Sequence, residues 1–96
     1  MAGIEHTNHL LLAALRHPLR RRILRLMVDG EALSPSQLAE TLNESLSSVS
    51  YHVRVLAECG ALVSAGEKPV RGATQHFYRW ALEADWAKTM LGESDE

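Results

Sequence analysis

The sequence contains a single cysteine, no long hydrophobic run and no overall excess of positive charge. Because Cys59 is alone, an internal disulfide and a multi-thiolate metal site within one chain are excluded, although two protomers could still pair their cysteines; this usage is typical of a reducing compartment. No apolar run approaches the roughly 20 residues that span a bilayer, and no signal peptide opens the chain. We therefore expect a cytoplasmic protein without membrane contact, folded as one domain over residues 1–96.

The sequence also lacks the residue sets that catalysis requires. Its serines cluster at expected helix starts, where capping accounts for them, and no glycine-rich phosphate loop follows a strand. We expect neither an enzyme nor a bound cofactor. The net charge of -2 argues against nucleic-acid binding, but the acids are unevenly placed: residues 1–80 hold nine Arg or Lys and seven Asp or Glu, whereas residues 81–96 hold one Lys and five acids.

The N-terminal third predicts two helices. Residues 5–16 carry an apolar stripe, and the His17-Pro18 step ends this helix because the residue before proline avoids the helical conformation. Pro18 suits the first turn of a second helix that runs to about Val28 and stops at Asp29-Gly30. Helical spacing on the second helix predicts burial of Leu19, Ile23, Leu26 and Met27.

Two further helices are expected to meet at a tight turn within residues 34–60. Ser34-Pro35-Ser36-Gln37 has a serine cap, a proline in the first turn and a glutamine that can reach back to the cap. This helix should end near Asn43, which tolerates a left-handed conformation. Ser47 is then expected to cap a helix to about Cys59, closed by Gly60. The expected core positions of the pair are Leu38, Ala39, Leu42, Val49, Val53 and Leu56.

After Gly60 the hydrophobic pattern changes from helical to alternating. Residues 61–65 and 74–80 are strand-like and flank a turn-rich stretch, Glu67 to Gly72, which predicts a hairpin over residues 61–80. A final helix is expected over residues 83–91. The predicted fold is mainly α with a small β-hairpin (α+β): a winged helix-turn-helix of about five helices with a two- or three-stranded wing.

A helix, a tight turn, a second helix and a basic hairpin form a geometry that suits duplex DNA, because a helix fits the major groove and the hairpin can reach an adjacent backbone. We expect the wing residues Lys68 and Arg71 to contact phosphates, with Gly72 permitting the tight turn, and Arg20 to contribute from the second helix. The expected contact stripe of the recognition helix is Ser47, Ser48, Ser50, Tyr51 and Arg54.

Residues from His17 to Trp80 resemble ArsR-type winged helix-turn-helix regulators of bacteria in the segments HPLRRRIL, LSPSQLAETL, SSVSYHVRVLAECGALV and RGATQHFYRW. The resemblance implies transcriptional control, usually repression, by a homodimer joined through its terminal helices. The sequence departs from the ArsR-type metal sensors in one respect. It lacks their cysteine pair on the helix before the recognition helix, and it lacks their alternative acidic and histidine ligands on the last helix. The sequence therefore predicts no bound metal.

We expect the terminal helices, 5–16 and 83–91, to form the dimer interface, because one small domain cannot easily cover so many apolar residues at both ends. Truncation at Ala81 should then give monomers. The expected interface residues are Leu11, Leu12, Leu15, Trp86, Met90 and Leu91.

Two other hypotheses remain. The low net charge would also suit a winged-helix module that docks another protein through its recognition helix. Alternatively, His6 and His9, three residues apart, could share a metal ion, although surface histidines are the more common explanation because no cysteine or carboxylate supports the pair and Glu5 is only adjacent in sequence. His52 is interpreted as a hydrogen-bonded packing residue and Cys59 as a half-buried, inert thiol.

Overall fold

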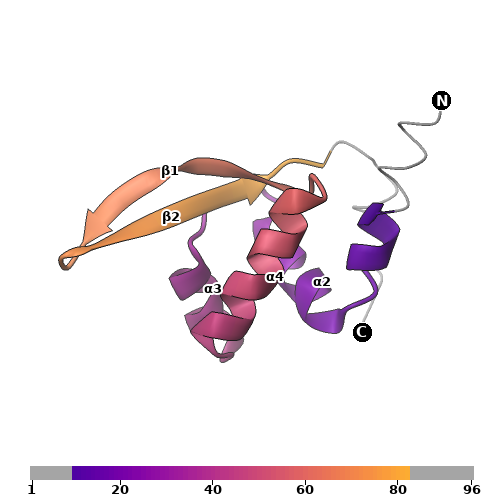
Figure 1. The fold of residues 1–96 in the computed structure, drawn as a ribbon, viewed down its shortest axis with the longest axis horizontal. Coiled ribbons are helices and arrows are strands. Elements are labelled where there is room, and N and C mark those ends of the chain that lie inside the picture. Colours follow the sequence, from indigo (N-terminus) through magenta and orange to yellow (C-terminus); the bar gives the residue numbers. More distant parts are fainter. Residues whose placement is uncertain (1–9, 83–96) are drawn as a thin grey trace.

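The computed structural model describes residues 10–82 and arranges them as a helical body from which a long hairpin projects (Figure 1). Residues 10–14 are helical, and the helices α2, α3 and α4 follow before the hairpin begins. Within the described residues, no helix is long and apolar enough to cross a membrane. The named elements are α2 (Pro18–Met27), α3 (Pro35–Leu42), α4 (Leu46–Glu58), β1 (Leu62–Val70) and β2 (Ala73–Trp80).

Local capping determines where α2 and α3 begin. His17 is extended and its Nδ1 accepts the Leu19 N–H at 3.2 Å, with Pro18 in the first turn, so the predicted break at this step is confirmed. Ser34 and Gln37 form the predicted capping box, in which each side chain accepts a hydrogen bond from the other residue's backbone N–H. At the end of α3, Asn43 is left-handed with φ 57° and ψ 46°, as predicted.

The start of α4 was predicted one serine too late. Ser45 rather than Ser47 is the cap, because its hydroxyl accepts the Ser48 N–H at 3.2 Å and α4 already begins at Leu46. The turn is shorter than expected because Asn43 reverses the chain at once and the Glu44 N–H returns to the Ala39 carbonyl at 3.0 Å. Only three residues therefore separate the two helices.

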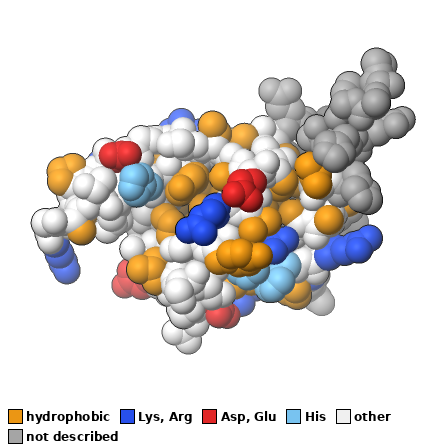
Figure 2. Space-filling model, in the orientation of Figure 1, with side chains coloured by type: hydrophobic (Ala, Val, Ile, Leu, Met, Phe, Trp, Pro, Cys, Tyr) orange, Lys and Arg blue, Asp and Glu red, His pale blue; other side chains and the backbone are white. Residues whose placement is uncertain are grey.

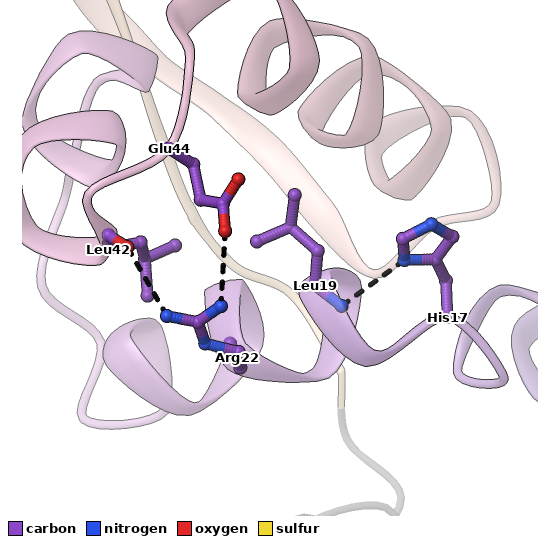
Figure 3. A network of polar contacts seen from close by, with 5 residues as sticks. All are labelled: His17, Leu19, Arg22, Leu42 and Glu44. Carbon is purple, nitrogen blue, oxygen red and sulfur yellow. Dashed lines mark hydrogen bonds and ion pairs between the residues drawn. The ribbon is translucent and has the colours of Figure 1, made fainter.

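Arg22 attaches α2 to this short turn (Figure 3). Its guanidinium donates to the Leu42 carbonyl at 3.3 Å and to the Glu44 carboxylate at 3.4 Å. The pair is partly exposed, so the ionic contribution is small, but the two contacts together fix the end of α3 against α2.

One hydrophobic core joins the N-terminal helical residues, α2, α3, α4 and the start of β1. The predicted core positions on α4 and Leu38 of α3 are buried. Leu26 and Leu42 are only partly buried, whereas Leu24 is completely buried and was not predicted. The largest completely buried side chains are Ile23, Leu24, Met27, Leu38, Val49, Val53 and Leu56.

The hairpin is longer than its sequence pattern indicated. The expected turn over residues 67–72 is wrong: β1 and β2 pair up to Val70 and Ala73, leaving a turn of only Arg71 and Gly72. A register shift between Ser64 and Glu67 accommodates Gly66, which has φ 111°, and pairing then resumes. One isolated bridge, Leu33 to Tyr78, ties the hairpin to the helices in place of a third strand.

The predicted fold class is confirmed as helices followed by an antiparallel two-stranded hairpin. The structure describes four helical segments where about five were predicted, since the expected helix over residues 83–91 lies outside the described residues, as does the first part of the expected helix over residues 5–16.

Candidate nucleic-acid interface

The exposed face of α4 carries the predicted stripe of small, phenolic and basic side chains. Tyr51 has 54% of its surface exposed and Arg54 is exposed, while Ser48 and Ser50 are half-buried between these residues and the core. Ser47 is exposed in the first turn. Leu46, 51% exposed at the helix start, extends this face and was not predicted. Short serine side chains leave room for the helix backbone to approach a ligand closely.

A groove of mixed character runs beside α4, between the start of α3 and strand β2. Its apolar and aromatic lining is Pro35, Leu46, Val53 and Tyr78, and its polar lining includes Ser36, Ser50, Arg54, Thr74, Gln75 and His76. Ser34, buried below it, donates its hydroxyl to Gln75 Oε1 at 2.8 Å while it caps α3, so one side chain joins the wing to the helix-turn-helix. Sequence reasoning missed the contribution of β2 because the groove forms only when the hairpin folds back to α3.

The two predicted wing cations occupy different parts of the hairpin. Arg71 lies in the turn at the end of the hairpin. Its backbone φ is 55°, a left-handed conformation that residues other than Gly, Asn and Asp rarely adopt. Lys68 lies within β1, opposite Gln75, with its Nζ 5.7 Å from the centre of the Phe77 ring, and it lines a second depression away from the α4 groove. Figure 2 shows basic side chains both at the end of the hairpin and over α4 on one face of the molecule.

Arg20 is not a freely extended side chain on α2. It is partly buried, and its Nε–H donates to His52 Nδ1 on α4 at 3.0 Å. The His52 ring lies 4.2 Å from that of His17, centre to centre. Burial lowers the pKa of His52 below its ordinary value of 6.5, and the neighbouring His17 and Arg20 lower it further. The imidazole is therefore held neutral, as an acceptor for Arg20.

The predicted dimer residues are divided between core and surface. Leu11 and Leu15 are buried in the hydrophobic core, whereas Leu12 is 44% exposed. Leu10 is also exposed, and it lines a shallow apolar depression with Ala13, Val55 and Cys59. Trp86, Met90 and Leu91 lie outside the described residues.

No group of three or more His, Cys, Asp or Glu side chains within residues 10–82 is arranged to hold a metal ion. The alternative metal site at His6 and His9 lies outside that range. Cys59 is half-buried, and its thiol donates to the Leu56 carbonyl at 3.4 Å.

Comparison with known proteins identifies the fold and the family. The sequence model of a family described as a helix-turn-helix domain matches residues 15–64, more than half of the chain. Comparison with curated protein sequences gave no match.

Several solved structures share the fold over nearly the whole chain. The reduced form of HlyU from Vibrio cholerae is 25% identical, with a TM-score of 0.72 over 96% of this chain and 88% of that chain. The homodimeric winged helix-turn-helix DNA-binding domain Mb0332 from Mycobacterium bovis, described as a possible ArsR-family regulator, is 18% identical, with a TM-score of 0.72 over 95% of this chain and 77% of that chain. The transcriptional repressor BigR from Xylella fastidiosa is 25% identical, with a TM-score of 0.64 over 92% of this chain and 79% of that chain. These similarities confirm the predicted winged helix-turn-helix fold.

Proposed function

The chain belongs to the helix-turn-helix domain family, and on that premise we propose that it is a sequence-specific DNA-binding transcriptional repressor that acts as a homodimer. The observation that carries this proposal is the exposed polar and basic stripe of α4, flanked by a groove whose lining includes hydroxyl and amide side chains and by a wing with an arginine in its turn. No reacting group has to be invoked, because a regulator of this kind acts by occupying its operator.

In the proposed complex, α4 enters the major groove. The serines of its first turns permit close approach, and Tyr51 and Arg54 reach base edges or phosphates; an arginine can bond guanine through two nitrogens. The hydroxyls of Ser36 and Thr74 in the neighbouring groove are suited to phosphate oxygens. Arg71, at the end of the wing, then contacts the adjacent backbone without carrying sequence information.

The proposed homodimer places two copies of α4 on an inverted-repeat operator, with half-site centres about one helical turn, or a multiple of it, apart. The M. bovis relative, which is homodimeric, supports this arrangement. So do the exposed Leu10 and Leu12, which would be covered by a second protomer. The proposed interface also includes Trp86, Met90 and Leu91, and repression follows if the operator overlaps a promoter.

The test is selection of random duplex DNA by the purified protein at moderate salt. We expect enrichment of an inverted repeat by the wild type and its loss when Tyr51 and Arg54 are both changed to alanine. Arg25→Gln is the matched control, since it removes a positive charge from α2 instead of α4 and should still enrich the same sequence. If the folded wild type enriches nothing, the protein-docking alternative, which the net charge of -2 favours, replaces this proposal.

A further inference from the structure

His52 lies inside the recognition helix but contacts groups from three directions. It is buried, with 7% of its surface exposed, between the exposed Tyr51 and the core residue Val53. Its ring meets the Tyr51 ring edge-on at 5.1 Å and lies against the His17 ring at 4.2 Å. Its Nδ1 accepts the Nε–H of Arg20. One imidazole therefore joins the start of α2 to the face of α4 proposed to contact DNA.

The contact leaves most of the Arg20 guanidinium available. An arginine has five N–H donors in one plane, and His52 uses only the one on Nε. No ion pair to Arg20 is found among residues 10–82. The hydrogen bond on Nε restricts the orientation of the guanidinium, and the imidazole that accepts it is itself in contact with Tyr51 of the exposed face of α4. A planar edge of this kind matches two oxygens of a phosphate.

We propose that His52 is a positioning residue for DNA binding: its neutral ring holds Arg20 so that the guanidinium contacts a backbone phosphate beside α4, and protonation of the ring in acid releases Arg20 and weakens the complex. This inference rests on the proposed function, because it assigns a role within the same DNA contact surface. His52 itself does not touch DNA in this arrangement.

The charges around His52 determine the sign of the pH effect. From the start of α2 it faces His17 and Arg20, and from its own helix Tyr51; none of these is a carboxylate that could stabilise a charged imidazole. A proton on Nδ1 would turn an acceptor into a donor and place a cation against Arg20. Burial first, then His17 and Arg20, lower the pKa of His52, so this change requires pH values below about 6.5. Glu58 lines the same depression as Arg20 and can pair with it after release.

The expected pH dependence is opposite to the general trend. Protonation of other histidines adds positive charge and should strengthen binding to a polyanion as the pH falls. A weakening in acid that depends on His52 therefore cannot be produced by net charge alone.

The experiment measures affinity for the selected duplex by fluorescence anisotropy at about pH 7.5 and about pH 5.5, with the salt varied around about 0.15 M. The variants are His52→Asn, which keeps a short acceptor that does not titrate, His52→Leu, which removes the acceptor, and Arg20→Gln. Arg25→Gln is the control for charge, because a spacing of five residues places it on another face of α2.

At about pH 7.5 we expect the affinity of His52→Asn to be within about two-fold of the wild type. His52→Leu and Arg20→Gln should bind roughly five-fold more weakly, and for these two variants the magnitude of the slope of log affinity against log salt should fall by about 0.9. On lowering the pH to about 5.5, the wild type should lose roughly five-fold in affinity relative to His52→Asn. Arg20→Gln should lack this loss, because it has no guanidinium to release. Arg25→Gln should keep the wild-type pH profile. Circular dichroism at each pH verifies that every variant is folded.

Each outcome decides the inference. A wild-type loss in acid that disappears in both His52→Asn and Arg20→Gln supports it, and if His52→Asn fails to fold, the comparison of the wild type with Arg20→Gln decides it alone. An unchanged ratio between wild type and variants over this pH range overturns the inference while DNA binding itself stands. A folded wild type that binds no duplex removes the proposed function and this inference with it.

Discussion

Replacing Arg71 with asparagine is expected to stabilise the protein while weakening its binding to DNA. Arg71 and Gly72 form the two-residue turn of the wing, and both have positive φ, 55° and 83°, the pattern of the hairpin turn that favours Asn-Gly. A left-handed residue other than glycine costs about 1–2 kcal/mol, of which asparagine recovers a part. We expect a gain of about 0.5–1 kcal/mol, which raises Tm by about 2–6 °C in a domain of this size.

The same change removes the proposed phosphate contact at the end of the wing. The magnitude of the salt slope should fall by about 0.9 in the anisotropy assay, and affinity should fall on all sequences alike. Lys68→Asn is the control for stability, because it removes one charge from a paired position of β1, where asparagine brings no gain in turn geometry. As a proposed phosphate contact it should lower the salt slope by a similar amount, but it should not raise Tm. A lower Tm for Arg71→Asn would refute the argument from backbone strain, and an unchanged salt slope would refute the phosphate contact.

Three further predictions concern stability. Ser34→Ala should lower the free energy of unfolding, measured by urea denaturation, by about 1–2 kcal/mol, because it removes the α3 cap and leaves Gln75 without its 2.8 Å partner. Ser36→Ala is the control: Ser36 is two residues away and exposed, and its replacement should change the free energy of unfolding little. Leu38→Ala should lower the free energy of unfolding, measured by calorimetry, by about 2–5 kcal/mol, because removing this completely buried side chain leaves a cavity. A smaller loss would mean that the core collapses to fill the cavity. Because the pKa of His52 is lowered on folding, the unfolded chain binds more protons, and the free energy of unfolding should decrease as the pH falls below about 6.5. A decrease as steep in His52→Asn would assign that effect to another group.

The sequence predicted the elements whose signals are local. The capping box of Ser34 and Gln37, the break before Pro18 and the left-handed Asn43 each depend on residues within one turn of one another, and all three are present. Helical periodicity likewise identified the buried face of α4. The error at Ser45 is also local: several serines in one stretch offered more than one cap, and the reversal at Asn43 selected the first.

What the sequence did not predict depends on contacts between distant residues. The hairpin continues past the bulge because each strand provides partners for the other, which the alternation within one strand does not reveal. Arg20 and His52 are 32 residues apart, and their hydrogen bond exists only because α2 packs against α4. The groove beside α4 similarly requires β2, brought there by Ser34 and by the bridge from Leu33.

The distribution of charge reconciles DNA binding with a net charge of -2. Residues 10–82 carry nine Lys or Arg against six Asp or Glu, whereas residues 83–96 carry one Lys against five acids. Several of the arginines serve the fold, since Arg22 pairs with Glu44 and Arg79 donates to the Gly30 carbonyl. The cations proposed to meet phosphates are then Arg20, Arg54, Lys68 and Arg71. These four correspond to a salt slope of about -3.6 for one protomer and about -7 for a dimer. A second copy doubles the number of proposed phosphate contacts, so the charge distribution is consistent with the proposed homodimer, as are the exposed leucines.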